Sequence, residues 1–139
     1  MVELVVDTNI FVAALRSEGG ASREVLRRVL RGQYRPVFGT TLWLEYEALL
    51  DRDVWTEETT AAEREAVLGA LARCGRWVTT YYGWRPNLRD EGDNHLIELA
   101  VAGNARAIVT HNVRDLASGE LRWARLRIVT PAQCLEEYP

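Results

Sequence analysis

The chain has 139 residues, of which 47% are hydrophobic and 27% are charged. A chain of this length buries a sizeable core, so we expect a single domain over residues 1–139. Its 17 basic and 20 acidic residues give a net charge of −3, which argues against binding to polyanions through bulk positive charge. No apolar run approaches the ~18 residues of a membrane helix, and no secretory leader is recognisable. We therefore expect a cytoplasmic protein that does not contact membranes.

The basic residues and the cysteines limit further which ligands and metal sites are expected. Every basic residue is an arginine, and the guanidinium group binds phosphate through two hydrogen bonds and stacks on bases. The two cysteines, Cys74 and Cys134, lie far apart and form no Cys-x-x-Cys motif. We therefore expect neither a thiolate metal site nor a disulfide framework.

The first half of the chain alternates between short strands and helices. Residues 2–6 are mostly apolar, which is typical of a buried parallel strand, and a turn follows at Asp7. A short helix is expected over 10–15, and Ser22 is a candidate cap for a second helix that ends at Gly32. The remaining elements expected in this half are a strand over 36–38, a helix from Thr40 or Thr41 to about Arg52, and a helix over 60–73.

The second half continues the same alternation. Thr130 and Gln133 have the spacing of a capping box around Pro131, which predicts a final helix. Short strands that alternate with helices predict an α/β sandwich with a five-stranded, mainly parallel sheet, with Asp7 at the carboxyl end of a central strand. Residues 114–123 are expected to form a loop. The other elements expected here are a strand over 76–81, a strongly periodic helix over 93–103, and strands over 105–110 and 127–129.

Three aspartates from distant parts of the sequence are expected at one edge of this sheet. Asp7 follows the first strand, Asp93 begins the helix that leads into the fourth strand, and Asp115 follows that strand. Ligands of such sheets bind beyond the carboxyl ends of the strands. Crowded carboxylates repel each other, and a bound cation relieves the repulsion. With Asn112 as a neutral oxygen ligand, the pattern indicates a Mg²⁺ or Mn²⁺ site.

Glu45 is a fourth acidic candidate. It lies three residues after Leu42 and four before Leu49, within an apolar stripe of its helix. A buried and unpaired carboxylate is costly, so Glu45 is expected to find a partner, and a metal ion is one. Asp93 likewise begins the core-facing stripe of its own helix, which continues at Leu96.

Each acid also has an ordinary structural explanation. Asp93 is a candidate helix cap, Asp7 is a candidate turn residue or cap, and Asp115 is a candidate solvated loop acid. Glu45 would be an exposed helix residue if its helix were rotated toward Trp43. A single shared metal site would explain the positions of all four acids.

The ordered set of these segments resembles the PIN-domain nucleases, the fold of the VapC-type toxins of bacterial toxin–antitoxin pairs. The strand that ends in Asp7-Thr8-Asn9 is similar to the start of that family, and Glu45 stands in a similar helix. Residues 89–93 are similar to an Arg-Asp-Pro-Asp-Asp-like segment of one subgroup of toxin components, and differ from it at Glu91 and Gly92. The other segments that carry the resemblance are Asp93 to Ala100, Ile108 to Leu116 and Ile128 to Pro131.

The resemblance implies a PIN-like three-layer sandwich and a Mg²⁺- or Mn²⁺-dependent endoribonuclease. It implies RNA as the substrate and a small antitoxin protein as a partner, and we also expect a homodimer. The implied acidic core, which is both catalytic and metal-binding, consists of Asp7, Glu45 and Asp93. The positions that match supporting polar residues of the family are Thr8, Asn9 and Thr110.

The fourth ligand is open at this point. Many members of the family carry an acid two residues after the strand-end threonine, where this chain has Asn112. Asp115, which follows three residues later, is the fourth catalytic candidate. The fourth ligand is therefore Asn112, Asp115 or neither.

Other polar residues near these motifs have weaker indications. Arg23, Arg27 and Arg31 recur every four residues opposite an apolar helix face. A solvated helix face is the favoured explanation, and contact with RNA or the antitoxin is the alternative. His95 is expected to point away from Asp93 and to have an ordinary surface role.

Two other functions fit parts of the pattern. A PIN-like interaction module with a weakened site would explain Asn112. A different α/β enzyme with an acidic site, such as a Mg²⁺-dependent phosphatase or a receiver domain, is the other alternative. The phosphatase type expects a second aspartate where Asn9 stands, and the receiver type expects a lysine, which the chain lacks.

Overall fold

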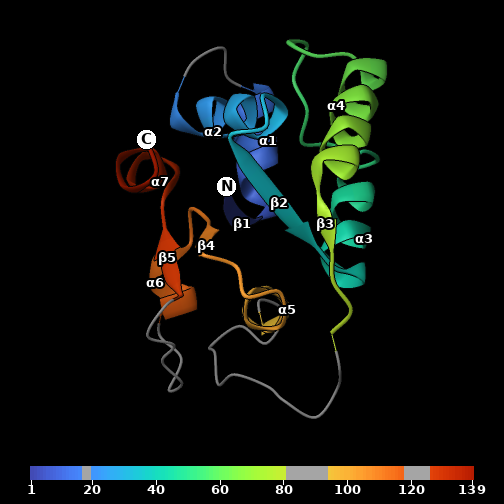
Figure 1. The fold of residues 1–139 in the computed structure, drawn as a ribbon. Helices are drawn as coiled ribbons and strands as arrows, with labels where there is room; N and C mark the ends of the chain where they lie inside the picture. Colours follow the sequence, from blue (N-terminus) through green and yellow to red (C-terminus); the bar gives the residue numbers. More distant parts are fainter. Residues whose placement is uncertain (17–19, 81–93, 118–125) are drawn as a thin grey trace.

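A sheet of five parallel strands forms the centre of the molecule (Figure 1). The computed structural model describes residues 1–16, 20–80, 94–117 and 126–139. The strands are β1 (Val2–Val6), β2 (Tyr34–Phe38), β3 (Arg76–Trp77), β4 (Ala107–Val109) and β5 (Arg127–Val129). Their order is β3-β2-β1-β4-β5, and every neighbouring pair in it is parallel. The predicted α/β fold with a five-stranded, mainly parallel sheet is therefore confirmed.

Helices surround this sheet on both faces. They are α1 (Thr8–Arg16), α2 (Ala21–Leu30), α3 (Thr40–Leu49), α4 (Ala61–Cys74), α5 (Asn94–Ala102), α6 (Val113–Ala117) and α7 (Pro131–Glu137). The chain runs outward from β1 to β3 through α1–α4, and then back across the sheet to β4 and β5. Because crossovers between parallel strands are right-handed, these opposite directions place α1–α4 and α5–α6 on opposite faces. No helix in the described ranges is long and apolar enough to cross a membrane.

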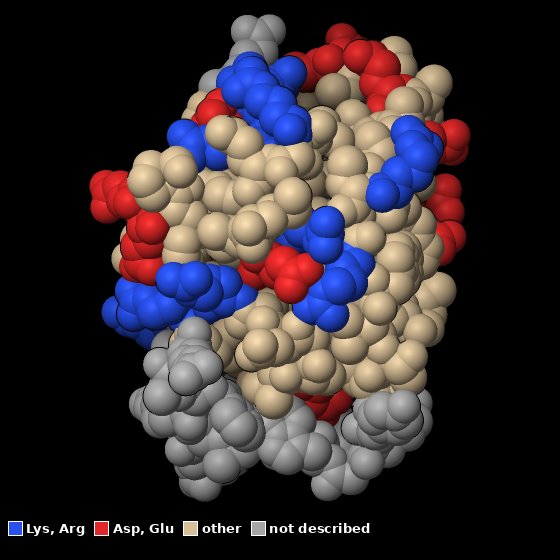
Figure 2. Space-filling view, in the orientation of Figure 1, with Lys and Arg blue, Asp and Glu red and all other residues tan. Residues whose placement is uncertain are grey.

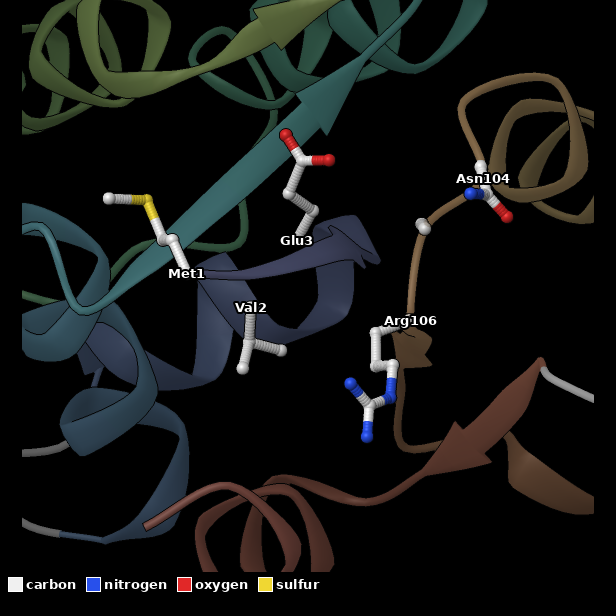
Figure 3. Close-up of a pocket in the computed structure, with 6 residues that line it drawn as sticks. Met1, Val2, Glu3, Asn104 and Arg106 are labelled. Atoms are coloured by element: carbon white, nitrogen blue, oxygen red, sulfur yellow. The ribbon is translucent and has the colours of Figure 1, made fainter.

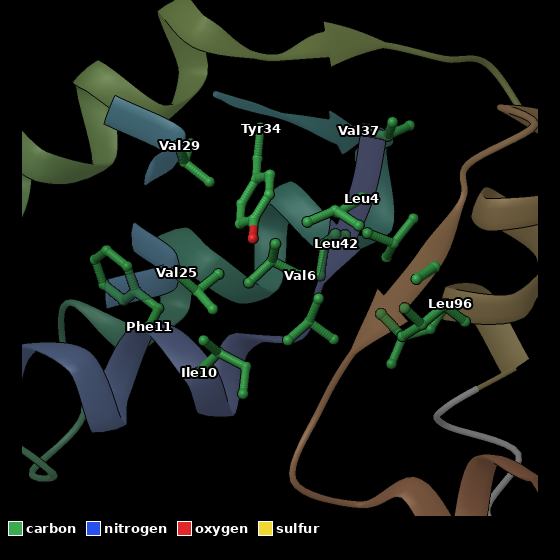
Figure 4. Packing of buried hydrophobic residues seen from close by; sticks show 14 of the residues in the cluster. Leu4, Val6, Ile10, Phe11, Val25, Val29, Tyr34, Val37, Leu42 and Leu96 are labelled. Atoms are coloured by element: carbon green, nitrogen blue, oxygen red, sulfur yellow. The ribbon is translucent and has the colours of Figure 1, made fainter. Parts of the chain in front are cut away.

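β1 lies in the middle of the hydrophobic core. Leu4 and Val5 are fully buried, because β1 has a strand on each side and helices on both faces. In Figure 4, Phe11 of α1 and Leu96 of α5 reach the core from opposite sides of β1. This central position places Asp7 at the middle of the carboxyl edge of the sheet, as the sequence predicts.

Two elements of the second half differ from the predicted ones. β3 has only two residues instead of the predicted 76–81, because it pairs with β2 only at the end of that strand. Helix α6 occupies 113–117 and so includes the first four residues of the predicted loop 114–123, whose other residues lie outside the described ranges. Leu116 anchors α6, since its side chain is buried and its backbone N–H donates to the carbonyl of Asn112 at 3.2 Å.

The start of α2 also differs from its prediction. Gly20 precedes the helix with a φ of 106° and makes no side-chain cap, and glycine adopts this backbone region at the least cost. Ser22 therefore lies inside the first turn of α2 and does not cap it. Its buried hydroxyl lies 3.3 Å from Nε2 of His111 instead.

Candidate active site

Asp7 lies where β1 passes directly into α1. Its backbone N–H donates to the carbonyl of Val109 on β4 at 2.9 Å, and its own carbonyl accepts from the N–H of Ile10 at 3.0 Å. These two bonds hold the backbone at the junction between strand and helix. Asp7 is only 7% exposed, so its carboxylate is held in a largely buried position.

Neutral donors surround the Asp7 carboxylate. The Thr110 hydroxyl, at the end of β4, donates to Oδ2 at 2.7 Å. The amide Nδ2 of Asn9 lies 3.3 Å from the same oxygen, and the hydroxyl of Thr8 lies 3.5 Å from Oδ1. The three predicted supporting polar residues thus all contact Asp7.

The charge of Asp7 has no cationic partner among the described residues. Its neighbours Thr110 and Asn9 orient the carboxylate but cannot neutralise it. A carboxylate held in a buried position without a counter-charge is costly, and hard divalent cations prefer carboxylate oxygens. The carboxylate oxygens of Asp7 are therefore suited to bind a divalent metal ion.

Glu45 on α3 lies at the border of the buried helix face. Leu42, Tyr46 and Leu49 are buried, whereas the side chain of Glu45 is 42% exposed. Glu45 therefore lies between its two predicted positions, partly buried at the edge of the stripe, because Tyr46 takes the inward position one residue further along. Glu45 nevertheless has a partner, since its Oε1 lies 3.1 Å from Nε2 of His95 on α5.

His95 does not have the surface role that the sequence suggests. Its side chain is 14% exposed and contacts Glu45. Its second ring nitrogen, Nδ1, is buried and has no hydrogen-bond partner in the described part of the chain. His95 therefore connects α3 to the beginning of α5, two residues after Asp93 in the sequence.

Tyr46 experiences the charges of both Asp7 and Glu45. Its hydroxyl donates to the carbonyl of Val6, one residue before Asp7, at 2.7 Å. Burial raises the pKa of the Tyr46 phenol well above its ordinary value, and the negative charges of Asp7 and Glu45 raise it further. The two carboxylates, one from β1 and one from α3, therefore act on the same buried phenol.

The third predicted acid, Asp93, lies outside the described residues, as does the whole segment 89–93. Within the described ranges, no three side chains of the types His, Cys, Asp or Glu form a group that could hold a metal ion. The meeting of Asp7, Glu45 and Asp93 around one metal therefore stays a prediction.

The two candidates for the fourth ligand lie after β4. Asn112 is exposed, and its backbone N–H donates to the hydroxyl of Thr110 at 3.0 Å. Asp115 is also exposed and lies on α6, in a helix where the sequence predicts a loop. The choice between Asn112 and Asp115 stays open.

The three arginines proposed to contact RNA or the antitoxin have separate environments on α2. Nη1 of Arg23 donates to the carbonyl of Ala14 at 3.3 Å. Arg27 lies 3.8 Å from Glu24, and Arg31 is exposed at the end of the helix. Arg23 thus contacts α1 and Arg27 lies near an acid of α2 itself, and the predicted RNA contact stays a prediction.

Three contacts near the site were not predicted: Tyr46 with Val6, His95 with Glu45, and Ser22 with His111. Among these residues, Tyr46 alone has a signal in the sequence, because it lies at helical spacing between the apolar residues Leu42 and Leu49. The pairs His95–Glu45 and Ser22–His111 carry none, since their members are far apart in the chain and belong to different elements.

Comparisons with known proteins identify a family and a fold. The family model described as the PIN domain matches residues 3–114. A chain in the crystal structure of VapBC2 from Rickettsia felis bound to a DNA fragment from their promoter aligns with a TM-score of 0.60 and 14% identity, over 94% of this chain and 98% of that chain. No curated protein has a significant match to the sequence. At this low identity, the structural likeness shows the fold alone.

Proposed function

This chain belongs to the PIN-domain family, and from this premise we propose that it is a metal-dependent endoribonuclease and the toxin of a toxin–antitoxin pair. One observation carries the proposal. The Asp7 carboxylate is largely buried at the carboxyl end of the central strand, is oriented by neutral donors, and meets no cation in the described part of the chain. Such a carboxylate suits the binding of a metal ion better than it suits a purely structural role.

The proposal gives each side chain of the site a task. Asp7, Asp93 and Glu45 would hold Mg²⁺ or Mn²⁺, with Asn112 or Asp115 as the fourth candidate ligand. When bound, such a metal would lower the pKa of a coordinated water and neutralise charge on the scissile phosphate. Thr110 and Asn9 keep the Asp7 carboxylate in one orientation. Glu45, which His95 contacts, either serves as a ligand or orients the attacking water.

The antitoxin partner is proposed from the fold comparison. The matching Rickettsia felis chain belongs to a VapBC2 complex bound to promoter DNA. We propose by analogy that this chain, as one domain over residues 1–139, is inhibited by a small antitoxin protein. RNA as the substrate class and a cytoplasmic site of action belong to the same proposal.

Asn112 favours one second candidate function. Where many members of the family carry an acid, this chain has a neutral amide. A PIN-like module that binds nucleic acid or protein without cutting would tolerate that loss of charge.

A cleavage assay with matched variants tests the two functions. Wild type, Asp7→Asn and Asp93→Asn are purified identically and incubated with single-stranded RNA, with Mn²⁺ or with a chelator. Asparagine keeps the shape of aspartate and caps a helix about as well, so the melting temperature should stay the same or rise slightly as like charges are removed. Cleavage should require Mn²⁺ and should fall by orders of magnitude in both variants.

The outcomes separate the proposed roles. Full activity in a folded Asp93→Asn variant would exclude Asp93 as a ligand. If the wild type binds RNA or a partner protein but never cuts in Mn²⁺ or Mg²⁺, the interaction module is the correct function. Equal cleavage by wild type and Asp7→Asn would point to a contaminating nuclease and contradict the proposal.

A further inference from the structure

A groove opens directly beside the candidate active site. Its volume is about 610 Å³, and it begins at Thr8 and Asn9, the two residues that follow Asp7. From there it runs between α1 and the end of α3, past Val12 and Leu49. The groove is therefore continuous with the place where a scissile phosphate would lie.

The charged side chains that line the groove are both arginines. Arg16 ends α1, and Arg52 follows α3. Both are exposed, and within the described part of the chain neither forms an ion pair or a side-chain hydrogen bond. The acids that flank Arg52 in the chain, Asp51 and Asp53, are not among the residues that line the groove. Two guanidinium groups are thus available to a ligand on a chain whose net charge is −3.

We propose that this groove binds the RNA strand next to the scissile phosphate. Arg16 and Arg52 would pair with backbone phosphates, because the guanidinium fork matches phosphate oxygens. Val12 and Ala13, which are half-buried and line the groove, would provide an apolar surface for a sugar or a base. The proposal rests on the proposed nuclease function, and it names where the substrate lies.

The length of the groove suits a short run of nucleotides. Thr8 and Arg16 are the first and last residues of α1, and at 1.5 Å per residue they lie about 12 Å apart along the helix axis. Stacked nucleotides advance about 3.4 Å each. The strand would therefore place about three nucleotides between the catalytic edge and Arg16.

The cavity at the other end of the sheet offers no comparable site. It has a volume of about 520 Å³ and lies beside the amino ends of β1 and β4, where Glu3 and Arg106 line it (Figure 3). Its charged groups are already engaged. Glu3 accepts two hydrogen bonds from Arg76, and the guanidinium of Arg106 lies 5.6 Å from the centre of the Tyr138 ring. Of these two cavities, the groove that begins at Thr8 is the one lined by arginines without an ion pair in the described part of the chain.

The test measures RNA binding separately from cleavage. Arg16→Gln, Arg52→Gln and the double variant are compared with Arg73→Gln, which removes another exposed arginine from α4, outside the groove. Binding of a fluorescein-labelled, mixed-sequence single-stranded RNA is measured in the Asp7→Asn background at several salt concentrations. Cleavage kinetics are measured with the same substitutions in the active chain.

The groove variants should lose affinity while the control keeps it. We expect affinity at low salt to fall roughly threefold to tenfold for each groove arginine. The slope of log affinity against log salt should decrease by about 1.4 in the double variant, because each phosphate contact in a single strand contributes about 0.7. In the chain that retains Asp7, the groove substitutions should raise KM by a larger factor than they lower kcat. Melting temperatures equal to that of Arg73→Gln would exclude misfolding as the cause.

Each failure has its own signature. If the wild type cuts RNA but the groove variants bind like Arg73→Gln, the groove proposal is wrong and the nuclease function stands. If RNA affinity is unchanged and the double variant resists inhibition by the proposed antitoxin, the groove belongs to the inhibitor and the proposal is again wrong. If the groove variants lose RNA binding but the wild type never cuts, the groove binds RNA and the nuclease function fails.

Discussion

At the scale of single residues, one hydroxyl group connects three parts of the candidate site. Thr110 has no exposed surface. Its Oγ1 donates to Asp7 at 2.7 Å and accepts from the backbone N–H of Asn112 at 3.0 Å. The amide of Asn9 lies 3.5 Å from the same oxygen. The orientation of Asp7 therefore depends on Thr110 more than on any exposed neighbour.

Replacing Thr110 tests this dependence. Thr110→Val keeps the shape of the side chain but removes the hydroxyl, so Asp7 loses its shortest hydrogen bond and the N–H of Asn112 loses its acceptor. We expect the free energy of unfolding to fall by about 1–3 kcal/mol and Mn²⁺-dependent cleavage to fall with it. Urea denaturation and a cleavage assay measure the two effects. Thr110→Ser should retain most of both, and equal behaviour of the two variants would refute this role of Thr110.

His95 gives a second prediction at the same scale. Its Nε2 lies 3.1 Å from Glu45, and glutamine can place an amide nitrogen near that position, whereas alanine cannot. His95→Ala should reduce kcat because Glu45 loses its partner on α5, and His95→Gln should recover much of the loss. The kinetic comparison is made at equal folded fraction, judged by circular dichroism. If both variants have the same kcat, His95 does not position Glu45.

At the scale of elements, an ion-pair network joins the amino ends of the strands. Glu3 on β1 accepts hydrogen bonds from Nε and Nη2 of Arg76 on β3 at 2.8 and 3.0 Å. Arg35 on β2 lies 3.7 Å from the same carboxylate, and Arg76 also donates to the carbonyl of Gly103. The short strand β3 is thereby tied to β1 and to the segment that follows α5.

This network predicts a pH dependence of stability. The hydrogen bond from Arg76 and the positive charges of Arg76 and Arg35 lower the pKa of Glu3. The contribution of Glu3 to stability is therefore complete above its unfolded pKa of about 4.3 and is lost as the pH falls through the lower folded value. Glu3→Gln should cost about 1 kcal/mol near neutral pH. The difference from wild type, measured by urea denaturation, should shrink in acid. A difference that is constant with pH would contradict the assignment.

At the scale of the whole molecule, charge and packing have different distributions. On the face drawn in Figure 2, basic and acidic side chains are interspersed, in keeping with the small net charge. The buried hydrophobic residues instead form one cluster that includes residues from β1 to the C-terminal helix. The proposed RNA binding therefore depends on a local pair of arginines and not on a broad basic surface on that face.

The single cluster predicts one cooperative unfolding transition. Helix α7 packs on α2, and the hydroxyl of Tyr34 on β2 donates to the carbonyl of Tyr138 at 2.5 Å, so the end of the chain is tied to the sheet. Circular dichroism and tryptophan fluorescence should therefore give coincident urea transitions.

The thiol of Cys134 provides an independent probe of the same transition. Cys134 has no exposed surface, and burial raises the pKa of its thiol to about 11, so the reactive thiolate is scarce near neutral pH. Reaction of Cys134 with a thiol reagent should follow global unfolding. Reaction at low urea, or separate spectroscopic transitions, would argue for more than one folding unit.

The expected homodimer is tested separately, by light scattering on the folded protein.

Most of the fold could be predicted from the sequence, because its signals are local. The apolar run of β1, the helical spacing of buried residues and the capping box at Thr130 and Gln133 each act over a few neighbouring residues, and the capping box is confirmed. Alternating strands and helices then imply parallel crossovers, which place the strand ends at one edge. Asp7 lies at the strand end where the alternation predicts it, and the order of the motifs indicates the family.

Tertiary structure alone decided how the side chains of the site are paired. The sequence left Glu45 either in the apolar stripe or exposed, and it lies at the border of its helix face because Tyr46 takes the inward position and His95 approaches from α5. Ser22 meets His111 although 89 residues separate them, and Thr110 meets Asp7 across 103 residues. Spacing within one element limits which faces a side chain can occupy. Its partner is decided by the other elements that fold against that face, and no local pattern contains this information.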